Sequence, residues 1–244
     1  MAKTFVAYHG DPKLKATVVA KIEAHRLADE IAKGAYVREN GKTTYCAVCC
    51  LLEDPEGGHE RYEVEFGIPT QLAYLEDGIF ESLPDQQAIP WPERFMGAIP
   101  VGADLSKVWP RFAVWQMIDE KWGIVNTTDD EEIKAICRRV ADGYTRDLDG
   151  NPLSDENVEA LRWAAWDARA ARDARAARAA RAAWDARAAW AAWAAWDARD
   201  ARAARAAWAA WAARDAWDAR AARAAFVSAS SDELIRLLAA APAS

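Results

Sequence analysis

The stretch from residue 163 to residue 226 has none of the residues that usually end a helix. Between residues 163 and 226 there is no glycine, proline or asparagine, and glycine is absent from residue 151 onwards. A collagen helix, which needs glycine at every third position, is therefore excluded. Without turn residues the stretch has no sign of a break. We expect one long α-helix, because alanine is the best helix former and arginine is close behind it.

Other features are also missing. The chain has no run of 18 apolar residues, which argues against a transmembrane helix. The first four residues lead into a predicted short strand at residues 4–8 and not into the apolar segment of a signal peptide. Four cysteines, three of them within five residues, do not make the ladder of a disulfide-rich secreted domain. We expect a soluble, cytoplasmic protein with no membrane partner.

A strict triplet repeat fills residues 163–226. The first position of each triplet is tryptophan or arginine, ending on Phe226; the second is alanine or aspartate, and the third is always alanine. A step of three residues falls short of one helical turn of 3.6, so the large side chains follow a slow spiral and return to the same face every 18 residues. On this spiral the later half of the repeat has a tryptophan-rich side and an arginine-rich side.

The charges of the repeat and of the remaining chain have opposite signs. The repeat contains 12 arginines and 7 aspartates, a net charge of +5, whereas the whole chain carries −7, so the remaining residues carry −12. Such a basic rod could dock onto an acidic domain of its own chain or of a neighbour. Arginine with tryptophan also suits phosphate contact and base stacking. We do not favour nucleic acid, because the chain is acidic and aspartates are spread through the rod.

Nine tryptophans on an alanine-rich helix predict a binding surface, because exposed apolar patches of this size usually mark interaction sites. We expect the helix to pack against its own copies or a partner helix, with an interaction set of Trp184, Trp190, Trp193, Trp196, Trp208, Trp211, Trp217, Phe226, Arg187, Arg205 and Arg223. The leading interpretation is a non-enzymatic interaction or self-assembly protein that forms homo-oligomers. Alternatively, the triplet pattern is the product of a nine-base DNA repeat that expanded by slippage. In that case no binding surface was selected.

Residues 1–150 are predicted to form an acidic α+β head, mostly helical with a short sheet. Asp11 and Pro12 have the features of a helix start, and Asn40-Gly41 predicts a hairpin between residues 35–39 and 42–50. Residues 143–152 are read as a polar linker. The long helix follows over 151–226, and a short amphipathic helix, capped by Ser231 and Asp232, lies in a C-terminal segment of 227–244.

The head contains candidates for chemistry. Cys46, Cys50 and His59 could bind zinc, with Cys49 and His25 near them in sequence, because thiolate and imidazole are the ligands that zinc prefers. The same cysteines could instead be buried as small hydrophobes, or one could be a nucleophile activated by histidine. A head-based zinc- or thiol-dependent enzyme is therefore the alternative function, although we expect no enzyme and no cofactor.

A second group of candidates is acidic. Glu76, Asp77 and Glu81 lie on the helix predicted to follow Pro69, whose apolar stripe is Leu72, Leu75, Ile79 and Leu83. Three carboxylates on one helix could hold a divalent cation. Acidic residues on an amphipathic helix more often form its solvated face, and this is the interpretation that we favour.

Three motifs give the head a family resemblance. Tyr8-His9-Gly10-Asp11, the cysteine-rich hairpin strand, and Gly67-Ile68-Pro69 with Leu75-Glu76-Asp77 and Ile79-Phe80-Glu81 resemble a family of uncharacterised phage and bacterial proteins. Those proteins also join such a head to an alanine-rich, tryptophan-containing tail. The resemblance implies a bacterial or phage-infected cell and no particular activity. In the pattern of this family the two hairpin cysteines are four residues apart, as Cys46 and Cys50 are here. Cys49 therefore looks like an addition.

Overall fold

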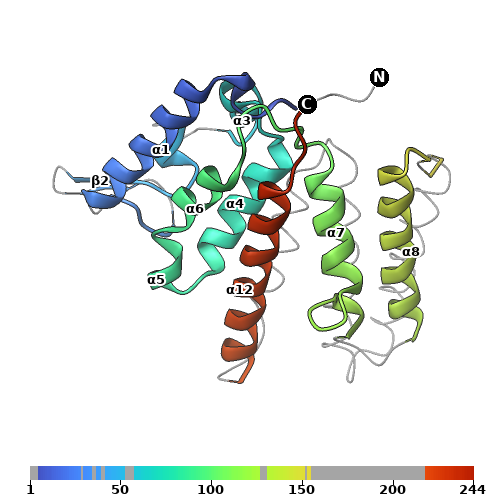
Figure 1. Ribbon diagram of the computed structural model, residues 1–244. Helices are drawn as coiled ribbons and strands as arrows, with labels where there is room; N and C mark the ends of the chain where they lie inside the picture. The colour runs from blue at the N-terminus through green and yellow to red at the C-terminus, as the bar shows by residue number, and fades with distance from the viewer. Residues whose placement is uncertain are drawn as a thin grey trace. The chain divides into compact units, whose positions relative to one another are not determined.

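The computed structural model describes residues 5–28, 30–34, 37–39, 42–52, 58–126, 131–151, 153–154 and 218–244 (Figure 1). The chain divides into two compact units, and each is described by itself. Unit 1 comprises Met1–Val108 together with Arg220–Ser244, and unit 2 comprises Trp109–Ala219. Most of the triplet repeat lies outside the described residues; its last triplets, from Asp218 onwards, are described.

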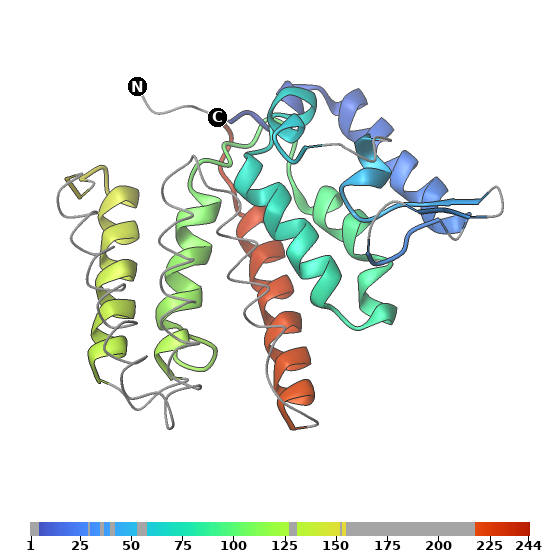
Figure 2. The same cartoon turned by 180° about the vertical axis from the view of Figure 1, so that it is seen from behind.

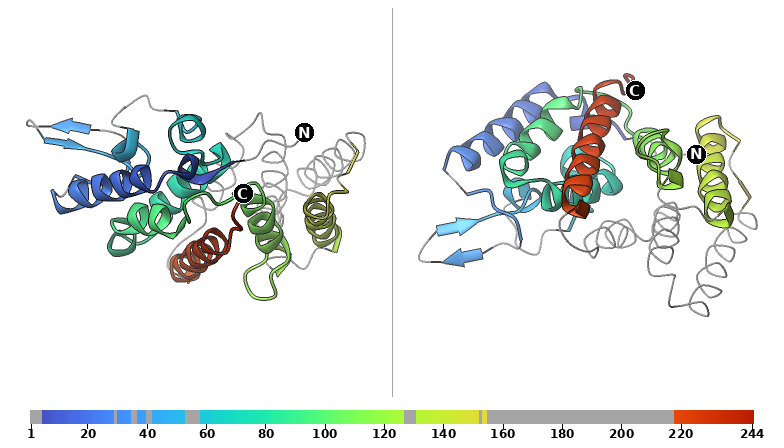
Figure 3. Two further views of the ribbon diagram at one scale, coloured as in Figure 1. Left: turned by 45° about the horizontal axis from the view of Figure 1, so that its top comes forward. Right: turned by 90° about the horizontal axis from the view of Figure 1, so that it is seen from below.

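Unit 1 is built mainly from helices. They are η1 (Ala7–Gly10), α1 (Pro12–Leu27), α2 (Cys49–Leu52), α3 (Arg61–Phe66), α4 (Thr70–Ser82), α5 (Asp85–Ala88), α6 (Trp91–Ala98) and α12 (Asp218–Ala239). Helix α1 packs against α6 and α2, and α4 packs against α3, α5 and α6 (Figure 3). The core of unit 1 therefore lies around α4, whose inward face is apolar apart from two acidic residues, Glu76 and Asp77.

Helix α1 begins where the sequence predicts. The side chain of Asp11 accepts a hydrogen bond from the Lys13 amide at 2.8 Å, and Pro12 occupies the first helical turn. This N-cap satisfies one of the backbone donors that a helix start leaves without a partner. The helix ends at Leu27. The strand predicted at residues 4–8 is wrong, since η1 starts at Ala7.

Helix α4 begins at Thr70, three residues after a glycine that adopts the left-handed backbone conformation. Gly67 has φ of 65°, and its amide and that of Ile68 close the end of α3 by hydrogen bonds to Glu63 and Tyr62. The predicted apolar stripe is confirmed, because all four of its residues, Leu72, Leu75, Ile79 and Leu83, are buried. The predicted solvated face is wrong in part: Asp77 is 7% exposed and Glu76 is fully buried.

Helix α12 joins the end of the repeat to unit 1. It runs from Asp218 to Ala239 without a break, so the helix start predicted at Ser231 and Asp232 is wrong, and the boundary placed at residue 226 falls inside the helix. After α12 the Asp104 amide donates to the carbonyl of Pro242 at 2.8 Å, and the Ser244 amide donates to that of Gly102 at 3.0 Å. The segment that follows α12 is therefore fixed to the residues around Gly102 and Asp104 of unit 1.

The predicted α+β fold class is wrong, because the described residues are mostly helical. Their one regular sheet is a hairpin of two three-residue strands, β1 (Val37–Glu39) and β2 (Lys42–Thr44), paired antiparallel with Val37 opposite Thr44. It extends away from the helices (Figure 2). Glu39 pairs with Lys42, on either side of the predicted turn, and residues 40 and 41 themselves lie outside the described residues. The second strand ends at Thr44, before the cysteines. A hairpin this small builds no layer of the core.

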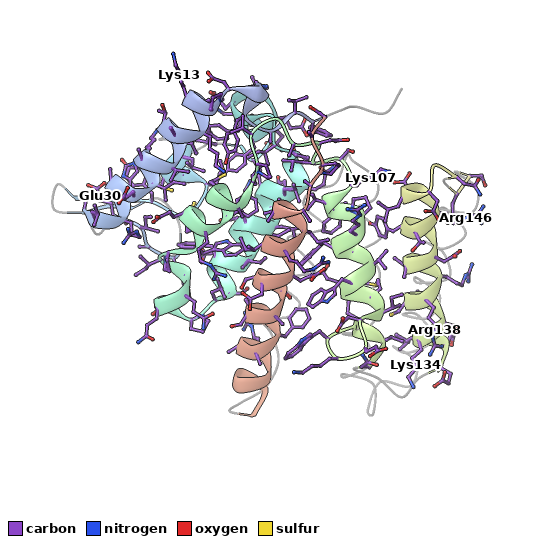
Figure 4. All side chains as sticks on the ribbon, in the orientation of Figure 1. Lys13, Glu30, Lys107, Lys134, Arg138 and Arg146 are labelled. Atoms are coloured by element: carbon purple, nitrogen blue, oxygen red, sulfur yellow. The ribbon has the colours of Figure 1, made fainter. Side chains whose placement is uncertain are left out.

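Unit 2 contains α7 (Val108–Ile118, its first residue in unit 1), η2 (Ile124–Asn126) and α8 (Glu131–Leu148). Trp109 meets Tyr144 edge-on, with ring centroids 6.3 Å apart. Helix α8 continues to Leu148. The polar linker predicted at residues 143–152 is therefore wrong for residues 143–148. Lys134, Arg138 and Arg146 project from α8 (Figure 4). Among the described helices of both units, none has the length and apolar character that crossing a membrane requires.

Candidate functional site

Unit 1 brings together most of the polar residues that the sequence singles out. The group consists of Cys46, Cys49, Cys50, His59, Tyr62, Glu76 and Asp77, and we call it the thiol–carboxyl cluster. The cysteines come from the turn before α2 and from α2 itself, His59 precedes α3, Tyr62 lies on α3, and the two acids lie on α4. Three short segments of the chain thus surround one buried carboxyl group.

Glu76 is the centre of the cluster. Its side chain is fully buried, its Oε2 accepts a hydrogen bond from the Tyr62 hydroxyl at 2.7 Å, and its Oε1 is buried with no hydrogen-bond partner among the described residues. Burial, with the nearby Asp77 charge, raises the pKa of Glu76 well above its usual value, although the Tyr62 hydrogen bond acts in the opposite direction. Glu76 therefore keeps its proton at a pH where an exposed glutamate has lost it.

Buried aromatic residues belong to the surroundings of Glu76. Tyr8, Tyr62 and Trp91 are fully buried, and the Trp91 indole N–H donates to the backbone carbonyl of Glu76 at 3.0 Å. Burial, followed by the carboxyl group of Glu76, raises the pKa of both Tyr8 and Tyr62. These hydroxyls stay protonated, and each has an acceptor: Met96 O for Tyr8 and Glu76 Oε2 for Tyr62.

The three cysteines differ in exposure and in hydrogen bonding. Cys46 is half-buried, Cys49 is 8% exposed and Cys50 is fully buried. The Cys49 amide donates to Cys46 Sγ at 3.4 Å, and the Cys50 thiol donates to the Ala47 carbonyl at 3.0 Å. The pKa of Cys46 is raised chiefly by its hydrogen bond with the Cys49 side chain, and that of Cys50 chiefly by burial. Both are thiols at neutral pH.

His59 pairs with the second carboxyl group. Its Nε2 lies 3.3 Å from Asp77 Oδ2, and both side chains are nearly buried, at 13% and 10% exposed. The imidazole ring stacks on Tyr74, with centroids 3.9 Å apart and planes 10° from parallel. The nearest partners of His59 are thus a carboxylate and an aromatic ring.

The metal predictions gain no support from the structure. In the part of the chain that the structure describes, no group of three His, Cys, Asp or Glu side chains is placed to hold a metal ion. Cys46 and Cys50 do not share a strand face, because they lie in a turn and in α2. His25 bonds to Glu30 at 2.7 Å. Glu81, the third predicted cation ligand, accepts from the Gly34 amide, so the acids of α4 serve different contacts.

Of the predicted interaction residues, only two are described. Phe226 is 5% exposed in α12, and Arg223, one triplet earlier, is half-buried with its Nε atom buried. The remaining members lie outside the described residues: Trp184, Arg187, Trp190, Trp193, Trp196, Arg205, Trp208, Trp211 and Trp217. Their role stays a prediction.

Sequence reasoning missed the part that Glu76 and Tyr62 play. A signal was present, since Leu72, Glu76 and Phe80 are spaced four residues apart and so share one helix face. Leu72 and Phe80 are fully buried, and so is Glu76, which lies between them on that face. A single acid in an otherwise apolar row therefore marked the cluster.

Comparison with protein-family models, curated proteins and solved structures finds no match to the chain. The resemblance to phage and bacterial proteins accordingly stays a prediction, and function has to be argued from the residues themselves.

Proposed function

We propose that this is a non-enzymatic interaction or assembly protein, in which the triplet-repeat helix packs against a second copy of the chain. The observation that carries the proposal is the burial of Phe226, which is only 5% exposed although it is the last large residue of the repeat. In α12 the triplet position places its ring against folded protein. The tryptophans upstream occupy the same position of the repeat.

The anchoring of α12 adds to this argument. Arg94 of α6 pairs with Asp232 at 3.1 Å, and the Ser228 hydroxyl donates to the Gln87 side chain at 2.9 Å. Val227, Leu234 and Leu238 of the same helix are fully buried. The repeat thus leads into a helix whose position on unit 1 is fixed, which lowers the entropy cost of presenting a binding surface.

The composition of the chain indicates why the repeat attracts a partner and why that partner is a second copy of the chain. Alanine lines the helix between the large residues, so a second helix can approach closely and receive the tryptophan rings in its grooves. The repeat carries +5 and the other residues −12, so that the repeat of one copy is attracted to the acidic remainder of another. A second copy therefore satisfies both the apolar and the electrostatic requirement.

The test is the solution mass of the full chain with Trp190, Trp193, Trp208 and Trp211 changed to alanine. We expect this variant to have a lower mass than the unaltered protein in size exclusion with light scattering. The matched control changes Arg172, Arg175, Arg178 and Arg181 to lysine, which alters as many triplet positions but keeps the charge, and it should keep the multimer. An alanine variant with unchanged mass would contradict the proposal.

A truncated head is unsuitable for this experiment. Cutting the chain at residue 150 would remove α12, and with it the buried residues Val227, Leu234 and Leu238. Unit 1 would then expose the apolar surface that α12 covers and could associate for that reason alone. Substitutions inside the repeat avoid this difficulty, because they leave α12 in place.

The thiol-dependent alternative is less well supported. A cysteine that serves as an enzyme nucleophile at neutral pH needs a stabilised thiolate and a histidine close to it. Burial and hydrogen bonding instead raise the pKa of Cys46 and Cys50, and His59 lies against Asp77 and Tyr74. No observation on the described residues favours nucleic acid over protein as the partner of the repeat.

A further inference from the structure

We propose that Cys46 and Cys49 form a reversible thiol–disulfide site that exchanges with low-molecular-weight disulfides. The inference is independent of the proposed assembly function, since it concerns unit 1 and not the repeat. It rests on the backbone geometry around the two sulfur atoms, on their unequal exposure and on the separate hydrogen bonding of Cys50.

The backbone brings the two side chains together. Cys46 stands at the entrance of α2, where its carbonyl accepts from the Cys50 amide at 3.0 Å and its Sγ accepts from the Cys49 amide at 3.4 Å. The side chains of Cys46 and Cys49 are themselves hydrogen-bonded. Two cysteines separated by two residues at the start of a helical turn have the arrangement found in dithiol–disulfide sites.

The neighbouring thiol has a different partner. Cys50 is fully buried and its S–H donates to the Ala47 carbonyl at 3.0 Å, whereas Cys49 contacts Cys46 through both its amide and its side chain. Closing a bond between Cys46 and Cys50 would break the Ala47 contact and move a core side chain. Closing one between Cys46 and Cys49 joins atoms that are already adjacent.

The unequal exposure of Cys46 and Cys49 indicates which thiol reacts first. Cys46 is half-buried and can be reached by a small molecule, while Cys49 is 8% exposed. The Cys46 thiol loses its proton to solvent, and its sulfur attacks one sulfur of the external disulfide RSSR. This forms Cys46–S–S–R and releases RS⁻, which takes up a proton.

The second step closes the internal bond. Cys49 loses its proton and attacks the Cys46 sulfur, which forms the Cys46–Cys49 disulfide and releases the second RS⁻, again protonated by solvent. In total two cysteine thiols are oxidised, RSSR is reduced to two RSH molecules, and no other electron acceptor is needed. A small dithiol reverses both steps by the same chemistry.

The surroundings predict a strong pH dependence of the rate. Cys49 and Asp77 of α4, the partner of His59, act on the Cys46 thiol, and Cys46 in turn acts on Tyr62 of α3; Glu76 of α4 and Lys21 of α1 act on the neighbouring Cys50. Asp77 disfavours the thiolate of Cys46, while at Cys50 Glu76 disfavours the thiolate and Lys21 favours it. Since the thiolate is the attacking species, oxidation should be slow at neutral pH and accelerate as the pH rises.

The test uses the folded full chain in buffers of oxidised and reduced glutathione, followed by acid quenching, blocking of remaining thiols and mass spectrometry of the tryptic peptide of residues 43–61. This peptide contains all three cysteines of the cluster. We expect it to lose two hydrogen atoms in oxidising buffer and regain them with dithiothreitol, and fragmentation should place the bond between Cys46 and Cys49. Cys50→Ser should behave in the same way.

Two further variants separate the steps. Cys49→Ser should stop at a mixed disulfide between Cys46 and glutathione, and Cys46→Ser should form neither species. Circular dichroism verifies the fold of each variant, and fragmentation of the unaltered protein identifies the pairing without any substitution. A peptide that stays fully reduced in the unaltered folded chain, or a bond from Cys46 to Cys50, would overturn the proposal.

Discussion

Replacing Glu76 by glutamine should stabilise the protein increasingly as the pH rises. The buried carboxyl group must release its proton inside the core of unit 1, where its Oε1 has no described partner. Glutamine has nearly the same shape, can still accept the hydrogen bond of Tyr62 and cannot ionise. At a pH where Glu76 is protonated in both the folded and the unfolded chain, the two proteins should have similar free energies of unfolding.

The size of the effect follows from proton linkage. Because the folded-state pKa of Glu76 is raised above its ordinary value of 4.5, the folded protein binds the proton more tightly than the unfolded chain. The stabilisation from that proton is complete below pH 4.5 and is lost as the pH rises toward the folded-state pKa. Across this window the variant should gain about 1.4 kcal/mol over the unaltered protein per pH unit.

The measurement is urea denaturation followed by far-ultraviolet circular dichroism, at several pH values above the isoelectric point of about 5.1. Glu65→Gln is the matched control: it also removes one carboxylate, on α3, but that side chain is 45% exposed and pairs with Arg61. Its effect should stay within about 0.5 kcal/mol at every pH. If the difference between Glu76→Gln and the unaltered protein does not change with pH, the account of Glu76 is incorrect.

Two further predictions concern the residues that begin and end helices of unit 1. Asp11→Ala should lower the free energy of unfolding by about 0.5–2 kcal/mol, because it removes the side chain that caps α1. Asp11→Asn, which keeps a capping oxygen, should not lower it. Equal urea midpoints for the two variants would refute the stabilising role of this cap. Gly67→Ala should cost more than about 1 kcal/mol, since φ is 65° and the new Cβ would lie 2.1 Å from the Val6 carbonyl oxygen. Gly97→Ala, with open space around it in α6, should be neutral or stabilising, and a loss as large as that of Gly67→Ala would contradict the steric argument.

Local signals in the sequence predict the parts of the fold that depend on local interactions. The start of α1 at Asp11 and Pro12, the pairing of β1 with β2 and the apolar stripe of α4 all follow from neighbouring residues. The fold class was wrong because the segment around the cysteines has β-prone residues but enters α2. Its turn is held by tertiary contacts, such as the bond from Lys21 to the Leu51 carbonyl, that sequence spacing does not show.

The candidate site was predicted only in part. Cys46, Cys50 and His59 do lie in one region, but their contacts are with Cys49, Ala47, Asp77 and Tyr74 rather than with a shared metal ion. The burial of Glu76 could not be weighed in advance, because the cost of burying an acid depends on a partner, Tyr62, that lies 14 residues away in the sequence. Chain spacing alone does not predict such a pair.

The central claim is that the repeat mediates self-association, and the mass of the full chain in solution tests it most directly. Light scattering across a dilution series should give a mass above the 26.9 kDa of one chain, which falls toward that value on dilution. Raised salt should favour dissociation if the charges of the repeat contribute to the contact. A mass of 26.9 kDa at every concentration would contradict the account.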